Sequence, residues 1–290
     1  MITVALSPFA ILRPHGFDDF MARIDEVMAQ ARAQGADLVV LPEYASMVLA
    51  GAYCDVPDVA AELEAVVSRA DQLIAAYRTL ARAHGLMLLA GTVPMRGADG
   101  RTRNRAPLID DQGRIGFQDK SVMTRFESER WGIVPGQPPS VFETGWGRLG
   151  ISICYDSEFP ALTRAQVLAG AEIILIPACT DTQHGFNRVR LSARARALEN
   201  QCFTAVAPTT GIAPWSATLD ENRGHACAFG PVDRGFADDG VIGSGAPDDP
   251  SLLLVPLDRA RLATLRNDPA VRNRDDWPDH HPPARIVTLA

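Results

Sequence analysis

A glutamate, a lysine and a cysteine each follow an apolar segment of this sequence. Glu43 comes after Asp37-Leu41, Lys120 after the segment that begins at Ile115, and Cys154 after Leu149-Ile153. Strand ends are where α/β sheets place their sites, so the three side chains could meet at one sheet edge. Together they would supply a thiol nucleophile, a carboxylate that takes its proton and a cation that holds an oxyanion. Individually, each residue is also compatible with a structural role or an exposed position.

The surroundings of Cys154 predict a strand, a helix and a second strand. A polar turn at residues 155–158 precedes Pro160, which suits the first turn of a helix, and Gly170 is typical of a helix C-terminus. The apolar segment Ile173-Ile176 then predicts the next buried strand. At such a junction, backbone N–H groups and a helix dipole point at the sulfur, so we expect them to favour a thiolate.

The rest of the chain alternates in the same way, which indicates an α/β fold. We expect further strands at 2–7, 37–41, 86–90, 104–109, 115–118, 140–144, 202–207, 226–229, 240–244 and 252–255, and further helices at 16–34, 58–84, 186–200 and 258–265. Residues 125–130 are expected to form a charge-dense loop. No internal repeat or linker is evident, so residues 1–290 are interpreted as one domain, with residues 267–290 as a C-terminal arm.

Composition excludes several classes of function. The 290 residues include 47 % hydrophobic and 22 % charged residues, and the net charge of -7 gives no footprint for nucleic acid or an anionic membrane. Five cysteines without a C-x-x-C pair argue against disulfides and zinc. We see no signal peptide and no apolar run of the roughly 20 residues that cross a membrane, so a cytoplasmic location is expected. Gly145, Gly147 and Gly150 match G-x-G-x-x-G, but they open a strand rather than a helix, so we reject dinucleotide binding.

Five segments make the chain resemble the nitrilase superfamily of carbon–nitrogen hydrolases over nearly its whole length. They are LPEY around Glu43, QDK around Lys120, GISICYDSEFPALTR around Cys154, AGAEIILIPACTD and RARALENQCF. The last segments look closest to an amidohydrolase-like branch, some members of which are fused to acetyltransferase domains. The resemblance implies a four-layer αββα sandwich that commonly forms a homodimer or higher homo-oligomer through the helices after Cys154 and Asp181.

A second catalytic glutamate is also implied by the resemblance. In the family it lies between the lysine and the cysteine, a few residues before a Pro-Gly pair. Glu127 and Glu129 are both close enough, and the family spacing of seven residues before the glycine, here Gly136, selects Glu129.

The resemblance further implies the chemistry. Glu43 would accept the proton of Cys154, and Lys120 and the backbone N–H of Tyr155 would stabilise the oxyanion, with no metal or organic cofactor. The substrate would be a small amide, carbamoyl compound or nitrile, and we expect an amidase before an N-carbamoyl amino acid hydrolase, a nitrilase or a non-catalytic binding protein on the same fold. Residues considered as substrate contacts are Asp181, His184 and Arg188.

Overall fold

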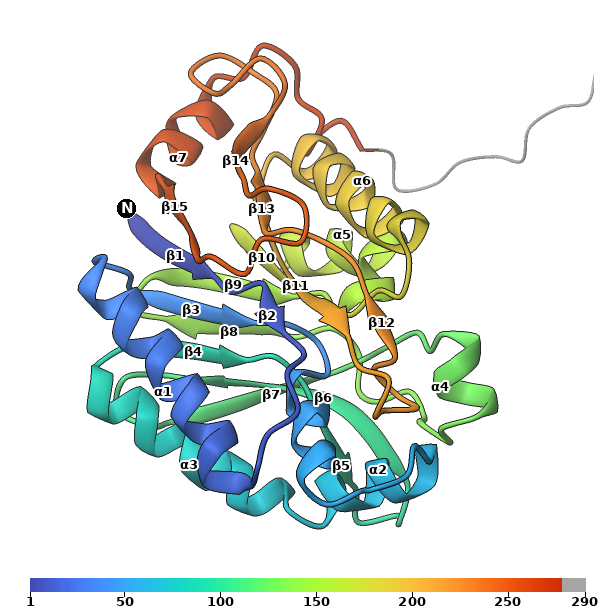
Figure 1. Ribbon diagram of the computed structural model, residues 1–290. Coiled ribbons are helices and arrows are strands. Elements are labelled where there is room, and N and C mark those ends of the chain that lie inside the picture. Colours follow the sequence, from blue (N-terminus) through green and yellow to red (C-terminus); the bar gives the residue numbers. More distant parts are fainter. Residues whose placement is uncertain (278–290) are drawn as a thin grey trace, which may run out of the picture.

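Two mixed β-sheets lie between outer helices in the computed structural model, which describes residues 1–277 (Figure 1). The first sheet has the order β15-β1-β3-β4-β6-β5, with β7 paired to β6. Its strands are β1 (Ile2–Leu6), β3 (Leu38–Leu41), β4 (Met87–Ala90), β5 (Val93–Arg96), β6 (Thr102–Ile109), β7 (Ile115–Asp119) and β15 (Leu253–Leu257).

The second sheet has the order β14-β13-β11-β10-β9-β8, with β2 and β12 both paired to β11. Its strands are β2 (Phe9–Ala10), β8 (Val141–Thr144), β9 (Gly147–Ile151), β10 (Ile173–Ala178), β11 (Phe203–Ile212), β12 (Glu221–Asn222), β13 (Cys227–Phe229) and β14 (Val241–Ser244).

Helices cover the outer face of each sheet, which gives the four layers of an αββα sandwich (Figure 1). Helices α1 and α3 pack on the first sheet, and α5 and α6 on the second. The helices, including the two 3₁₀ segments η1 and η2, are α1 (Phe17–Ala33), η1 (Ala45–Ala52), α2 (Val59–Val67), α3 (Ala70–His84), α4 (Arg125–Glu129), η2 (Cys154–Glu158), α5 (Pro160–Leu168), α6 (Gln183–Asn200) and α7 (Arg259–Asn267).

The central parallel strands are apolar on both faces because they are covered on both. In β3, Leu38 and Val40 pack with residues of the second sheet such as Ile151, whereas Val39 and Leu41 pack with the α1 and α3 layer. β3 pairs in parallel with β1 on one side and β4 on the other. Glu43 therefore follows a strand that is paired along both edges and packed on both faces.

The predicted fold class is confirmed, and two local predictions are wrong. The helical segment expected at 58–84 is two helices, because Asp58 caps α2 and the chain breaks at Ser68 and Arg69 before α3. The short strand β5 was not predicted, and residues 125–129 form a helix rather than a loop. The single-domain organisation stays a prediction. In the predicted arm, Val271 accepts a bond from Gln201 of the same chain, and residues 278–290 lie outside the described part.

A buried carboxylate joins the two halves of the chain near β12. Glu62 of α2 is 1 % exposed and accepts bonds from three consecutive residues of the loop before β12. The donors are the Ser216 hydroxyl at 2.7 Å, the Ala217 N–H at 2.7 Å, and the N–H and hydroxyl of Thr218 at 3.1 and 2.6 Å. The loop is thus fixed by polar contacts that satisfy the buried charge.

Candidate active site

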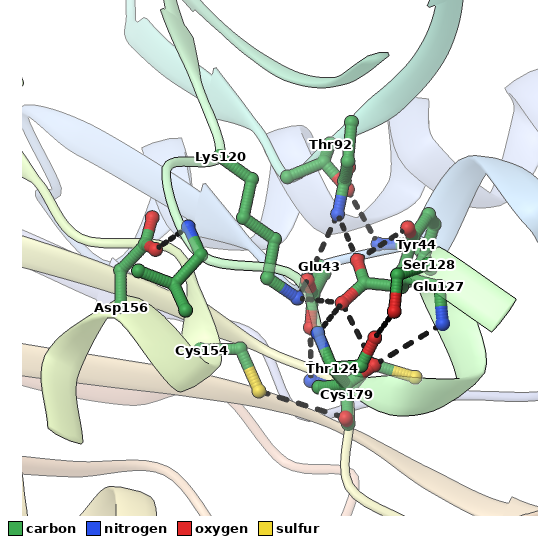
Figure 2. Close-up of polar contacts among 12 residues, drawn as sticks. Glu43, Tyr44, Thr92, Lys120, Thr124, Glu127, Ser128, Cys154, Asp156 and Cys179 are labelled. Carbon is green, nitrogen blue, oxygen red and sulfur yellow. Dashed lines mark hydrogen bonds and ion pairs between the residues drawn. The ribbon is translucent and has the colours of Figure 1, made fainter. Parts of the chain in front are cut away.

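The residues predicted to do chemistry gather where strands of both sheets end (Figure 2). Glu43 follows β3 and Lys120 follows β7, both in the first sheet. Cys154 begins η2, three residues after the end of β9 in the second sheet. The strand-end argument therefore places all three residues in one cluster, as the sequence predicted.

Lys120 bridges two buried carboxylates. Its ammonium Nζ lies 2.8 Å from Glu43 Oε1 and 2.6 Å from Glu127 Oε2. Lys120, Glu43 and Glu127 are each no more than 2 % exposed. Burial opposes the charge of Lys120, but the negative charges of Glu127 and Glu43 prevail and hold its pKa well above the usual value. Lys120 is thus a permanent cation.

The glutamate beside Lys120 is Glu127, so the sequence-based choice of Glu129 is wrong. Thr124 caps α4, and its N–H and hydroxyl both donate to Glu127 Oε2 at 2.9 Å, which turns that carboxylate back into the site. Glu129 lies two residues further round the helix, where its side chain is 55 % exposed and pairs with Arg125. The capping-box pattern Thr124-x-x-Glu127 is the sequence signal that distinguishes the two glutamates.

Uncharged groups complete the shell around the carboxylates. The Tyr44 hydroxyl donates to Glu127 Oε1 at 2.7 Å, and the Asn104 amide donates to Glu43 Oε1 at 2.9 Å and to Glu127 Oε1 at 3.3 Å. Neither Tyr44 nor Asn104 was predicted from the sequence. Because each donor is neutral, these bonds hold the two carboxyl groups without adding charge to the site.

Cys154 has a left-handed backbone with φ of 47°, an uncommon conformation for a residue with a Cβ. Its thiol donates to the carbonyl oxygen of Cys179 at 3.6 Å, while the Cys179 N–H donates to Glu43 Oε2 at 3.2 Å. The nucleophile and Glu43 therefore both contact the backbone of one residue, which follows β10. Strained backbone of this kind is concentrated at functional sites.

Burial and the adjacent carboxylate keep the Cys154 thiol protonated at rest. Burial first, and the adjacent Glu43 carboxylate second, raise the pKa of Cys154 well above its usual value. Burial also raises the pKa of Glu43 to about 7, although Lys120 acts in the opposite direction. The expectation that the junction favours a thiolate is therefore wrong for the resting state, because burial and the Glu43 charge outweigh the Lys120 charge and the bond to Cys179.

Two close backbone approaches fix the strand ends that carry the site. Gly91 has φ of 61°, and a Cβ placed there would lie 1.9 Å from the carbonyl oxygen of Pro42, the residue before Glu43. A Cβ at Gly136 would lie 2.0 Å from the Cβ of Asp119, the residue before Lys120. Only glycine permits these contacts, and both adjoin residues of the candidate site.

The residues considered as substrate contacts lie at the start of α6. Asp181 and His184 are exposed there, and Arg188 pairs with Glu158 of η2 at 3.5 Å. Their roles stay predictions. The Tyr155 N–H lies in the first turn of η2, where backbone donors have no acceptor within the helix.

Other features of the described chain lie apart from this site. A cavity of about 880 Å³ opens at the opposite ends of the strands, lined by residues such as Asp37 before β3 and Leu86 before β4. Residues 1–277 contain no cluster of three or more histidine, cysteine or acidic side chains arranged to hold a metal ion. In the same range, no helix combines the length and apolar character needed to span a bilayer.

Comparisons with known proteins place this geometry in a family. The profile described as Carbon-nitrogen hydrolase matches residues 3–267. The probable hydrolase YhcX of Bacillus subtilis is 28 % identical over 95 % of this chain, which spans only 53 % of YhcX. A deaminated glutathione amidase of Synechocystis sp. is 28 % identical, over 86 % of this chain and 90 % of its own length.

Solved structures agree with the sequence comparison. A double mutant of the amidase from Nesterenkonia sp. AN1, in complex with acrylamide, superposes with a TM-score of 0.71. It is 26 % identical, and the match covers 92 % of this chain and 94 % of the amidase. The protein is therefore an enzyme that acts on non-peptide carbon–nitrogen bonds, and it belongs to the carbon–nitrogen hydrolase family of the nitrilase superfamily.

Proposed function

We propose that this enzyme is an amidase that releases ammonia from a small carboxamide through a thioester on Cys154. The observation that carries the proposal is the buried arrangement in which Lys120 bridges Glu43 and Glu127 while Glu43 and the thiol of Cys154 both contact Cys179. This arrangement provides a nucleophile, a base and a fixed cation within a site shielded from water.

In the acylation step, Glu43 accepts the thiol proton as the sulfur attacks the amide carbonyl carbon. The carbonyl π electrons move to oxygen, and Lys120 and the Tyr155 N–H stabilise the resulting oxyanion. A preorganised donor of this kind contributes about 3–4 kcal/mol to barrier lowering. Because the pKa of Glu43 is raised to about 7, its conjugate acid can return the proton to the leaving nitrogen. The C–N bond then breaks, and ammonia leaves an acyl-thioester.

In the deacylation step, the same carboxylate takes a proton from water as the water oxygen attacks the thioester carbon. Collapse of the second oxyanion breaks the C–S bond, and the proton held by Glu43 returns to the sulfur. The carboxylic acid product leaves and the neutral thiol is restored. Glu127 holds Lys120 in place throughout, since its own pKa is kept below the usual value by Lys120 and the Thr124 donors despite its burial.

Amide substrates are favoured because the relatives with stated activities are amidases. The relatives include the deaminated glutathione amidase and the Nesterenkonia amidase, the latter observed with acrylamide. We would measure ammonia release from panels of small amides, ω-amides, N-carbamoyl amino acids and nitriles, with Cys154→Ala as the inactive control. Release from amides alone, lost in the variant, supports the proposal. Release from carbamoyl compounds or nitriles instead would reassign the enzyme, and release that survives in Cys154→Ala would refute the thioester mechanism.

We also propose that two copies associate through the α5 and α6 layer. Three leucines of this layer, Leu168, Leu191 and Leu198, are 70 %, 57 % and 41 % exposed. Sedimentation at micromolar concentration should give a dimer or larger oligomer that Leu191→Glu dissociates. Leu12→Glu is the matched control, since Leu12 is 61 % exposed but lies between β2 and α1, outside the α5 and α6 layer. A wild-type monomer would refute the assembly.

A further inference from the structure

A buried aspartate outside the predicted catalytic group connects the segments that carry Lys120 and Cys154. Asp156 lies in η2, two residues after Cys154, and is 3 % exposed. Its carboxylate accepts the Val122 N–H at 2.8 Å and the Ser121 N–H at 3.1 and 3.2 Å. Ser121 and Val122 directly follow Lys120, and Figure 2 shows the aspartate turned toward this backbone on the side of Lys120 away from Glu127.

We infer that Asp156 is a positioning residue that holds the two oxyanion donors, Lys120 and the Tyr155 N–H, at a fixed separation. Tyr155 precedes Asp156 in η2, so its N–H belongs to the segment that the aspartate anchors. Lys120 directly precedes Ser121 and Val122, whose N–H groups donate to Asp156. The inference rests on the proposed function, since it assigns a role within the same reaction.

Other contacts in the site do not perform this task. The bonds from Lys120 to Glu43 and Glu127 join groups that all belong to segments following the first sheet. Glu43 contacts the second sheet through groups at the ends of its strands, such as the Cys179 N–H after β10, and not through the backbone next to Lys120. Within residues 1–277, Asp156 is therefore the side chain that links the backbone next to Lys120 to the turn that carries Cys154.

Burying a carboxylate in this position costs free energy, which argues that its hydrogen bonds from the Ser121 and Val122 N–H groups have a role in the site. Burial raises the pKa of Asp156 to about 6, and the two N–H groups and the charge of Lys120 only partly offset this effect. A neutral side chain would avoid the cost, yet it would hold the backbone less firmly, because charge-assisted bonds are about twice as strong as neutral ones.

The inference separates two properties of Cys154 that a general structural defect would change together. Alkylation by iodoacetamide needs proton transfer from the thiol to Glu43 but forms no oxyanion. Amide turnover needs both the proton transfer to Glu43 and a stabilised oxyanion. Loosening the link between Lys120 and η2 should therefore slow turnover and leave alkylation nearly unchanged. A misplacement of about 1 Å in a catalytic group can cost on the order of 100-fold in rate.

The experiment compares the full-length wild type, Asp156→Asn, Asp156→Glu and Asp110→Asn. Asp110 is the matched control, since it also accepts two backbone N–H groups, at 2.7 and 3.0 Å, but at the far turn of the β6–β7 hairpin that ends at Lys120. For each variant we would measure kcat and KM for ammonia release, the rate of Cys154 alkylation by mass spectrometry, and folding by circular dichroism.

We expect Asp156→Asn to lower kcat about 100-fold, with KM and the alkylation rate within about threefold of wild type, and Asp110→Asn to change none of these. Asp156→Glu keeps the charge on a longer side chain and should lower kcat less. Turnover within threefold of wild type in Asp156→Asn, or alkylation that falls in parallel with turnover, would overturn the inference, as would failure of both Asp156 variants to fold. Absence of Cys154-dependent ammonia release from wild type is a different result, which would refute the proposed function instead.

Discussion

Replacing Glu127 by Gln, with Glu129→Gln as its matched control, tests how the site is assembled. Both glutamates lie in α4, and both changes remove one charge without shortening the side chain. Glu127 accepts bonds from Lys120, Tyr44 and Thr124 at 2.6 to 2.9 Å. A glutamine has only one acceptor oxygen, so at least one of these donors would face an NH₂ group instead.

The expected loss follows from the ion pair. Breaking a buried pair by removing one partner costs about 3–5 kcal/mol, and the lower value applies because Lys120 keeps its bond to Glu43. A loss of about 3 kcal/mol in the transition state is roughly a 150-fold fall in kcat/KM. The negative charge of Glu127 also raises the pKa of Glu43, so its removal should make Glu43 a weaker base.

The control should behave like wild type. Glu129 and Arg125 have side chains that are 55 % and 87 % exposed, and an exposed pair one helical turn apart contributes about 0.5 kcal/mol or less. The assay is ammonia release from the best amide in the substrate panel, with thermal unfolding of each variant measured in parallel. Activity of Glu127→Gln within threefold of wild type, or an equal loss in Glu129→Gln, would refute the assignment of Glu127.

Three further outcomes are expected. kcat/KM should rise as the pH increases through about 7, because Glu43 must be ionised to accept the thiol proton; a profile that is flat down to about pH 5 would contradict this role. Lys120→Met should abolish turnover and raise the pKa values of Glu43 and Glu127, so the carboxyls stabilise the fold only while protonated. Its melting temperature should therefore fall more steeply than that of wild type between about pH 5 and 8, and parallel curves would count against the bridge. Glu62→Gln should lower the free energy of unfolding by about 1–3 kcal/mol, because donors such as the Thr218 N–H lose a charged acceptor. Urea titration measures this change. An unchanged urea midpoint would show that the loop before β12 keeps its conformation without the Glu62 carboxylate.

Sequence reasoning located the site because its reactive side chains follow strand ends. Glu43, Lys120 and Cys154 each come shortly after a strand, and strand ends of a layered sheet meet at one edge. The choice between Glu127 and Glu129 failed because counting residues back from Gly136 ignores helical geometry. In α4 the third helical residue turns back to its cap, whereas the fifth points to solvent.

Features that depend on distant neighbours could not be predicted in the same way. Asp156 meets the backbone of residues 34 and 35 positions away, and nothing in its local sequence indicates those partners. The neutral resting state of Cys154 depends on burial and on Glu43, which is remote in the chain. Local sequence patterns predict the place of a residue relative to strands and helices. The protonation state of its side chain depends on the groups that the fold brings next to it.

The division of the site between the two sheets has a mechanical consequence. Glu43 and Lys120 leave strands of the first sheet, while Cys154 and Cys179 leave strands of the second. The sheets themselves are joined by apolar packing, in which Leu38 and Val40 contact the layer that contains Ile151. Catalysis is therefore sensitive to how the two sheets pack against each other. A small shift of one sheet relative to the other would separate Cys154 from Glu43 while every strand and helix stayed intact. Activity should be lost well before spectroscopic signs of unfolding appear.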